Sequence, residues 1–170
     1  MDNFQKLKGK SVLVTGGAGF IGSEVVRQLS SLGSKIIVFD NYSSGRKKYI
    51  NSIPNVKQIK GSITNPIQVN KVTKNVDYII NLAALPFIPD SYYYPNEFFR
   101  ANTEGTINLV MGIFNSKKLK RFVQISTSEV YGTAKFSPMS EDHPTLPQST
   151  YAASKLAAER AVFTLSLIHI

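Results

Sequence analysis

The sequence predicts an α/β fold, doubly wound around a parallel β-sheet. Three observations carry this prediction. Short apolar, β-branched runs alternate with helix-like segments, and four of the five runs are strongly apolar, as strands covered on both faces should be. A glycine-rich turn joins the first run to the first helix. Right-handed crossovers then place helices on both faces of the sheet.

The elements follow from these patterns in chain order. The expected strands are 11–15, 35–40, 56–61, 77–83 and 121–126. The expected helices are 20–31, 66–74, 95–116 and 151 to about 167, with Pro66 and Pro95 in first turns, where proline is tolerated. Residues 132–149 carry three prolines and are expected to form a long loop, which in a compact domain is usually functional or disordered.

The composition narrows the class of protein. A chain of 170 residues, 42% hydrophobic and 18% charged, is typical of one soluble globular domain. It has no cysteine, and His143 and His169 lie far apart, so we expect neither a disulfide nor a metal site. No apolar run is long enough for a membrane span or a signal peptide, and we expect a cytoplasmic protein.

The net charge of +9 raises the question of nucleic-acid binding. The basic residues fall in short groups at 45–48 and 117–121, without interleaved aromatic side chains. Solvated loops and helix ends explain such groups, and we expect no nucleic-acid partner. The same charge suits an anionic small substrate.

The stretch TGGAGFIGS at 15–23 indicates phosphate binding. Gly17, Gly19 and Gly22 satisfy G-x-G-x-x-G, and Gly16, Gly19 and Gly22 satisfy the wider G-x-x-G-x-x-G. One glycine makes the tight turn, another lets the backbone approach a pyrophosphate, and the last allows close helix–strand packing. The N–H groups at the helix N-terminus then face the phosphates.

Asp40 ends the second expected strand, 18 residues after Gly22. A carboxylate there accepts hydrogen bonds from both ribose hydroxyls of NAD and repels a 2′-phosphate. The cofactor expected is therefore NAD. Arg46 lies close enough to leave NADP as an alternative.

Two further segments carry candidate chemistry. Tyr151 and Lys155 are spaced i, i+4, so they share a helix face, and a nearby ammonium favours the phenolate that a tyrosine base needs. Thr127, Ser128 and Glu129 follow the fifth expected strand, at the sheet edge where ligands bind. Taken alone, the Tyr151–Lys155 spacing is commonplace on helices by chance. Taken alone, the segment with Thr127 is explained by a turn at a strand end that is rich in polar capping residues.

Six motifs occur together in one order: TGGAGFIGS, FDNYSSG, NLAA, NTEGTINL, STSEVYG and YAASK. In order and spacing they resemble the extended short-chain dehydrogenase/reductase family, and within it the NAD-dependent epimerase/dehydratase branch that acts on nucleotide sugars. The resemblance covers about residues 9–164 and implies a Rossmann-like NAD-binding domain with the smaller substrate domain largely missing. It also implies a homodimer in the full-length enzyme, through the helices at 95–116 and 151–167.

The resemblance implies roles for single residues. A catalytic set would comprise Thr127, Tyr151 and Lys155, joined by Ser128 and Glu129. NAD-binding positions would be Gly16, Gly19, Phe20, Ile21, Gly22, Asp40, Asn41, Ser62, Ile63, Leu82, Ala83, Ala84, Asn102 and Lys155, Asn102 supporting the active-site geometry. Ser62 stands where the family usually has an aspartate near the adenine, and Thr150 stands where it usually has proline; we expect the second change to be tolerated.

The resemblance also implies the reaction. Tyr151 would take the proton of the sugar 4-hydroxyl while C4 gives hydride to NAD⁺, which forms a 4-keto sugar. Glu129 next to Thr127 and Ser128 favours a 4,6-dehydratase, because elimination needs an additional carboxylate. A UDP-sugar 4-epimerase and a nucleotide-uronic-acid decarboxylase are the alternatives, and the epimerase would come first if Glu129 served only in an ion pair.

The last six residues, LSLIHI, are what a transposon-end sequencing adapter encodes. We therefore expect an NAD-binding domain at 1–164, incomplete at its C-terminus, and a non-native tail at 165–170. An intact transcript that ends at Ile170 would contradict this expectation. The chain as written would be poorly active, since loose positioning of a substrate costs orders of magnitude in rate. An alternative of another class is a non-catalytic dinucleotide-binding module.

Overall fold

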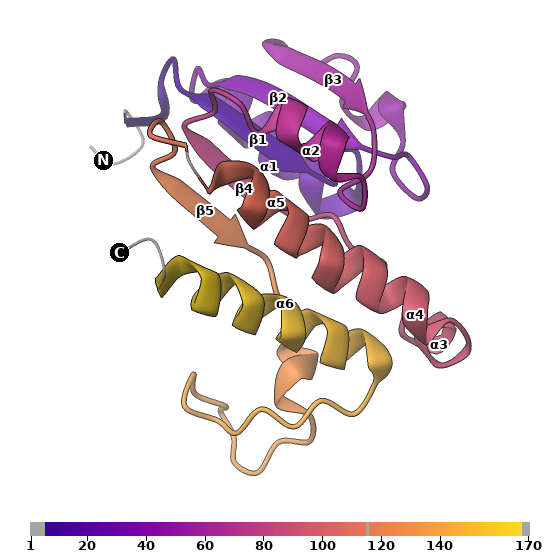
Figure 1. Ribbon diagram of the computed structural model, residues 1–170. Coiled ribbons are helices and arrows are strands. Elements are labelled where there is room, and N and C mark those ends of the chain that lie inside the picture. Colours follow the sequence, from indigo (N-terminus) through magenta and orange to yellow (C-terminus); the bar gives the residue numbers. More distant parts are fainter. Residues whose placement is uncertain (1–5, 115, 168–170) are drawn as a thin grey trace. The chain divides into compact units, whose positions relative to one another are not determined.

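The computed structural model describes residues 6–114 and 116–167. These residues fall into two compact units (Figure 1). The first unit comprises Met1–Ala83 and Asn108–Ile125. The second comprises Ala84–Ile107 and Ser126–Ile170.

A five-stranded parallel sheet forms the centre of the first unit (Figure 1). Its strands are β1 (Ser11–Thr15), β2 (Lys35–Asp40), β3 (Val56–Lys60), β4 (Tyr78–Asn81) and β5 (Arg121–Gln124). Their order is β3-β2-β1-β4-β5. The five expected strands are confirmed, although the last three end one or two residues earlier, where the chain leaves the sheet for its loops. The polar strand, β3, lies at an edge of the sheet and is only partly buried.

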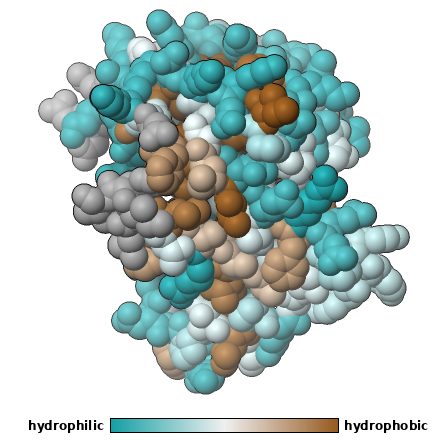
Figure 2. All heavy atoms as spheres, in the orientation of Figure 1, coloured by the Kyte–Doolittle hydropathy of each residue, from teal (hydrophilic) through white to brown (hydrophobic). Residues whose placement is uncertain are grey.

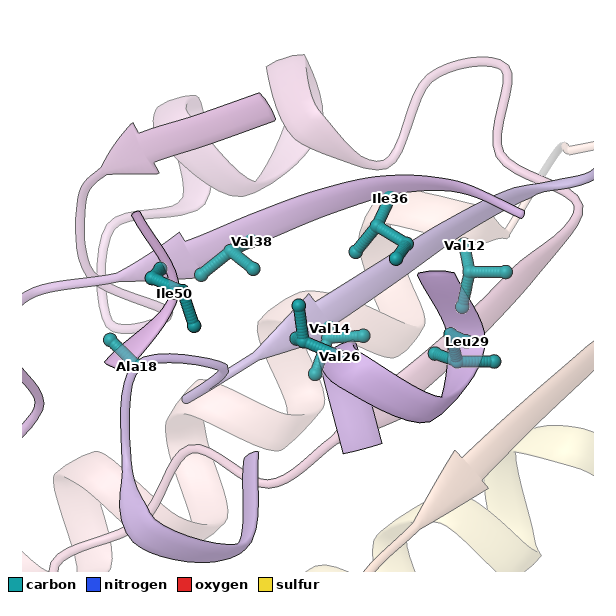
Figure 3. Packing of buried hydrophobic residues seen from close by; sticks show 8 residues of the cluster. All are labelled: Val12, Val14, Ala18, Val26, Leu29, Ile36, Val38 and Ile50. Atoms are coloured by element: carbon teal, nitrogen blue, oxygen red, sulfur yellow. The ribbon is translucent and has the colours of Figure 1, made fainter. Parts of the chain in front are cut away.

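One face of the sheet packs against α1 (Phe20–Ser31). Val12 and Val14 of β1 point to this face, where they meet Val26 and Leu29 of the helix (Figure 3). Ile36 and Val38 extend the same cluster along β2. Successive side chains of a strand point to opposite faces of the sheet, so the residues that alternate with these in β1 and β2 point to the other face.

The opposite face packs against α2 (Pro66–Val72) and the later part of α5 (Gly105–Ile113). Leu13 and Phe39, from β1 and β2, meet Val69 of α2 and Leu109 of α5. The Asn65 side chain caps α2, and Pro66 occupies its first turn as expected. Because helices cover both faces, the doubly wound arrangement is confirmed. On the face drawn in Figure 2, this unit is mostly hydrophilic, with hydrophobic residues in smaller patches.

The second unit is built from helices and a long irregular segment. Its elements are α3 (Ile88–Tyr93), α4 (Pro95–Phe98), a π-helix (Phe99–Glu104), the start of α5, a 3-10 turn (Ser128–Tyr131) and α6 (Thr150–Leu167). Residues 132–149 contain no helix or strand, as expected. The expected helix at 95–116 forms as three consecutive helical segments, α4, the π-helix and α5, and ends at Ile113, whereas α3 was not expected. Residues 165–167 of the expected tail belong to α6, and 168–170 lie outside the described residues.

The resemblance implies a homodimer through the helices at 95–116 and 151–167, and the apolar and aromatic residues of the first helix and of the segment before it differ in exposure. Val110 is buried, and Ile113 packs against the core of the first unit. Three neighbouring tyrosines in the second unit, Tyr92, Tyr93 and Tyr94, are exposed. The homodimer stays a prediction. None of the helices within the described residues has the length and apolar character needed to cross a membrane.

Candidate functional site

The glycine-rich turn follows β1 in the first unit. Gly16 has a φ of +66°, and a Cβ there would lie 2.8 Å from the backbone nitrogen of Ala83. A Cβ on Gly22 would lie 2.2 Å from the Gly16 carbonyl oxygen. These contacts match two of the needs inferred from the sequence, a tight turn and close packing of the helix on the turn.

The first turn of α1 carries the features of an anion-binding helix end. Gly19 is the N-cap and has no side chain to bond the leading N–H groups, which therefore depend on other acceptors. Phe20 and Ile21 are 92% and 62% exposed, which is unusual for large apolar side chains. A bound nucleotide would supply a phosphate to accept from these N–H groups and apolar surface to cover these side chains.

Asp40 lies at the carboxyl end of β2 and is buried. Its two carboxylate oxygens accept hydrogen bonds from the N–H of Ala18 at 2.9 Å and the N–H of Tyr42 at 2.8 Å. The carboxylate thus holds the glycine-rich turn to the loop after β2. A carboxylate has about four acceptor sites, so two remain for ribose hydroxyls. The residues present therefore fit a dinucleotide whose ribose carries no 2′-phosphate.

The other expected contacts on this side lie in the loops after β2 and β3. The Asn41 side chain accepts from the Ser43 N–H at 2.9 Å and shapes its own loop. Ser62, which stands in place of an aspartate, has its hydroxyl 2.8 Å from that of Thr64. Ile63 is buried in the core. At the position where the resemblance implies an aspartate near the adenine, this chain therefore has a pair of neutral hydroxyls.

A polar side-chain network that the sequence analysis missed crosses the ends of three strands. The Thr15 hydroxyl donates to Asn81 Oδ1 at 2.5 Å, and Asn81 Nδ2 donates to Gln124 at 2.8 Å. Leu82 and Ala83 donate their N–H groups to the backbone oxygen and the hydroxyl of Thr15. The sequence carries one signal of this network, namely a polar residue at the last position of each of these apolar strands. This network sets the backbone at two of the expected NAD contacts.

In the second unit, α6 carries Tyr151 and Lys155. The Tyr151 ring is partly buried and meets Phe98 edge-on, with ring centroids 6.4 Å apart. Lys155 is only 4% exposed. Burial lowers the pKa of the Lys155 ammonium, and the Glu159 carboxylate one turn further along acts against that decrease. The expected pair therefore lies on α6 with its lysine inside the protein.

Asn102, on the π-helix, connects three parts of the second unit. Its side chain accepts from the Leu85 N–H at 2.8 Å, and its amide nitrogen donates to the Leu85 oxygen at 3.2 Å and to Ser154 Oγ at 2.9 Å. Ser154 lies between the two candidate catalytic residues on α6, and its hydroxyl donates to the backbone carbonyl oxygen of Tyr151. Asn102 thus supports the backbone beside Ala84 and the helix that bears Tyr151.

Thr127 begins the 3-10 turn in the second unit. Its hydroxyl accepts from the Glu129 N–H at 3.3 Å. The side chains of Ser128 and Glu129 are exposed. Within the described ranges the ion pairs are Arg27–Glu24 and Lys118–Asp77, so Glu129 takes part in neither. The same ranges hold no group of three or more His, Cys, Asp or Glu placed to bind a metal ion.

Comparisons with known proteins show which proteins this chain is similar to. The sequence profile of the NAD dependent epimerase/dehydratase family matches residues 12–166. A UDP-glucose 4-epimerase from Lacticaseibacillus casei is 34% identical over 88% of this chain and 45% of its own length. UDP-glucuronic acid decarboxylase 1 from Danio rerio is 33% identical over 88% of this chain and 36% of its own.

A solved structure is similar to this chain as well. The dTDP-glucose 4,6-dehydratase DesIV from Streptomyces venezuelae, solved with NAD and TYD bound, gives a TM-score of 0.85 at 30% identity. The match covers 91% of this chain and 51% of that one. The chain therefore spans about half the length of the relatives it matches.

Proposed function

The chain belongs to the NAD dependent epimerase/dehydratase family, and from that premise we propose that it is the NAD-binding part of an enzyme that oxidises C4 of a nucleotide sugar. The observation that carries the chemistry is a buried Lys155 one turn from Tyr151 on α6. The glycine-rich turn and the Asp40 carboxylate support the choice of NAD over NADP.

Each residue has a distinct part in this proposal. NAD⁺, when bound, supplies the hydride acceptor. Tyr151 takes the proton from the sugar 4-hydroxyl, and the ammonium of Lys155 favours the phenolate that does so. The hydroxyl of Thr127 hydrogen-bonds the substrate oxygen and keeps it in line with the base. The product of this half-reaction is a 4-keto sugar still attached to its nucleotide.

We propose a 4,6-dehydratase as the complete activity. Its second step removes the proton at C5 and expels water from C6, which needs a carboxylate near the keto sugar. Glu129 has an exposed side chain directly after Thr127 and Ser128, and neither described ion pair includes it. The similarity to dTDP-glucose 4,6-dehydratase is consistent with this assignment.

A 4-epimerase is the second candidate, supported by the similarity to UDP-glucose 4-epimerases. It would return hydride to the opposite face of the keto sugar, and Glu129 would have no part in the chemistry. A nucleotide-uronic-acid decarboxylase, supported by the similarity to UDP-glucuronic acid decarboxylase 1, would release carbon dioxide from the 4-keto acid. A non-catalytic dinucleotide-binding module would bind NAD and transform no sugar.

The test begins with calorimetric titration of the chain with NAD⁺ and then adds dTDP-glucose, UDP-glucose or UDP-glucuronic acid. Reduced nicotinamide is followed by absorbance in a single turnover, and the sugar products are separated by chromatography. Tyr151→Phe should slow formation of reduced cofactor by about 10²- to 10⁴-fold while leaving NAD⁺ affinity nearly unchanged. No binding of NAD⁺ by this chain would contradict the proposal as a whole. Because the resemblance implies that most of the substrate domain is missing, absence of reduced cofactor favours the non-catalytic module only in a protein that carries that domain as well.

A further inference from the structure

Glu159 lies on α6, one helical turn beyond Lys155, and is partly buried. Its carboxylate accepts a hydrogen bond from the hydroxyl of Ser126. The two residues are 33 positions apart in sequence, and both belong to the second unit. This contact therefore attaches the chain that follows β5 to the helix that carries the candidate catalytic tyrosine and lysine.

Ser126 immediately precedes Thr127, the residue whose hydroxyl caps the 3-10 turn. The turn itself is held by local bonds, from the Val130 N–H to the Thr127 oxygen at 3.3 Å and from the Gly132 N–H to the Glu129 oxygen at 3.1 Å. Such local bonds set the shape of the turn but do not attach it to α6. The Ser126–Glu159 hydrogen bond supplies an attachment, and it is charge-assisted, hence stronger than a neutral one.

The same carboxylate acts on Lys155. Burial lowers the pKa of the Lys155 ammonium, and the charge of Glu159 raises it. Residues spaced i, i+4 lie on one face of a helix, which accounts for this interaction. The elements packed against α6 carry the other charged or titratable groups that bear on its environment, namely Asp90, Tyr92, Tyr93, Glu97, Arg100, Glu104, Glu129 and Tyr131, with Tyr151 and Arg160 on α6 itself.

We propose that Glu159 is a positioning residue of the catalytic unit, whose one carboxylate attaches the Thr127 segment to α6 at a position one helical turn from the buried Lys155. The proposal rests on the proposed function, because Thr127 and Lys155 matter to catalysis only if that function is correct. The geometric and electrostatic parts, however, can be measured on this chain without substrate or cofactor.

Two conservative variants separate the two parts. Ser126→Ala removes the hydrogen bond and leaves the carboxylate charge. Glu159→Gln removes the charge and keeps a side-chain oxygen that accepts from Ser126. Arg160→Gln is the control, since it changes one charge on an exposed neighbour in the same helix.

The readouts are amide hydrogen exchange at Glu129, Val130 and Gly132 and the pH titration of the Lys155 Nζ signal by ¹⁵N NMR. Ser126→Ala should speed exchange at these amides roughly ten- to hundredfold, the equivalent of one charge-assisted hydrogen bond, without moving the lysine titration. Glu159→Gln should shift the Lys155 titration to lower pH and, because its hydrogen bond with Ser126 is neutral and weaker, speed exchange by a smaller factor than Ser126→Ala does. Arg160→Gln should do neither.

A lysine titration that is unchanged in Glu159→Gln, or exchange rates that are unchanged in Ser126→Ala, would overturn the proposal. If one variant fails to fold, the other still gives a result, because the exchange rates and the lysine titration are measured independently. NAD⁺ affinity is measured on the same samples. If the unmodified chain does not bind NAD⁺, the proposed function is contradicted, whereas the effects of Glu159 on the Thr127 segment and on Lys155 can still be measured.

Discussion

Gly22 is the position of the glycine-rich turn where a side chain has the least room. A Cβ there would lie 2.2 Å from the Gly16 oxygen and 2.8 Å from Gly17 Cα, both backbone atoms that cannot rotate away. Gly22→Ala should therefore destabilise the chain by about 1–3 kcal/mol through forced backbone shifts. Urea unfolding measures the change, with Ser23→Ala in the same helical turn as the control. Equal stability of the two variants would contradict the packing role of this glycine.

Asp77 lies at the other end of the sheet, just before β4, and is buried. Its carboxylate accepts from the Ser11 N–H at 2.9 Å, and Lys118 Nζ lies 3.8 Å away. The Ser11 hydrogen bond, aided by nearby lysines and opposed by burial, lowers the pKa of Asp77 below its ordinary 3.8. The folded chain thus binds fewer protons than the unfolded chain between the two pKa values, so stability rises with pH there.

The stabilisation by Asp77 should be complete above pH 3.8 and should be lost as the pH falls through the lower, folded-state pKa. Asp77→Asn keeps an acceptor for Ser11, so it should cost less than about 1 kcal/mol at neutral pH. The difference between the two proteins should disappear in acid. Unfolding free energies across this pH range test the prediction, with the exposed Glu141→Gln as the reference variant. A difference that stays constant with pH would count against the charge of Asp77.

At the scale of elements, the π-helix at Phe99–Glu104 is held by Asn102. Asn102 bonds both backbone groups of Leu85 and the Ser154 hydroxyl, and its own carbonyl accepts from Thr106 Oγ1 at 2.7 Å. π-Helical segments within α-helices often mark functional sites. The interruption turns one expected helix into three segments, and it brings a buried amide to α6.

Asn102→Ala should cost about 2–4 kcal/mol, because it leaves several buried polar groups without their partner. Thr103→Val removes a single bond, from the Thr103 hydroxyl to the Ser154 oxygen at 2.8 Å, and should cost about 1 kcal/mol. Urea unfolding compares the two, and amide exchange at Leu85 should accelerate only in the first. Similar costs for both variants would argue against Asn102 as the centre of this network.

The long segment at 132–149 is organised around His143, which is buried. Its Nε2 accepts from the Lys135 N–H at 3.0 Å, and its Nδ1 lies 2.9 Å from the Pro144 oxygen. Donor and acceptor roles follow from these partners, so the ring carries its proton on Nδ1. Tyr131 and Phe136 pack against the ring.

His143→Phe keeps an aromatic ring against its neighbours and removes both hydrogen bonds. Tryptic cleavage after Lys135 should then become roughly tenfold faster or more, as expected for the loss of one to two hydrogen bonds. Cleavage after Lys74, in the first unit, gives the internal reference and should not change. Unaltered cleavage after Lys135 would mean that the segment is ordered by other contacts.

At the scale of the whole molecule, the expected cofactor contacts fall mainly in the first unit, and the expected catalytic residues all lie in the second. A ligand that binds only the folded chain stabilises it by mass action. NAD⁺ at a hundred times its Kd should therefore add about 2.7 kcal/mol to the free energy of unfolding. NADP⁺ at the same concentration should add much less, because the Asp40 carboxylate repels a 2′-phosphate. Thermal unfolding with each nucleotide measures this, and equal shifts would assign no selectivity to Asp40.

The sequence by itself determined the sheet, its helical cover and the glycine-rich turn, because each rests on local patterns. Apolar β-branched runs, first-turn prolines and closely spaced glycines restrict the backbone over a few residues at a time. The i, i+4 spacing of Tyr151 and Lys155 was equally local. Only the tertiary structure decided what depends on residues distant in sequence: the burial of Lys155, the π-helix held by Asn102, and the networks that join Thr15 to Asn81 and Ser126 to Glu159. Hydrogen bonds between residues tens of positions apart leave no periodic trace in one sequence, because only packing brings their partners together.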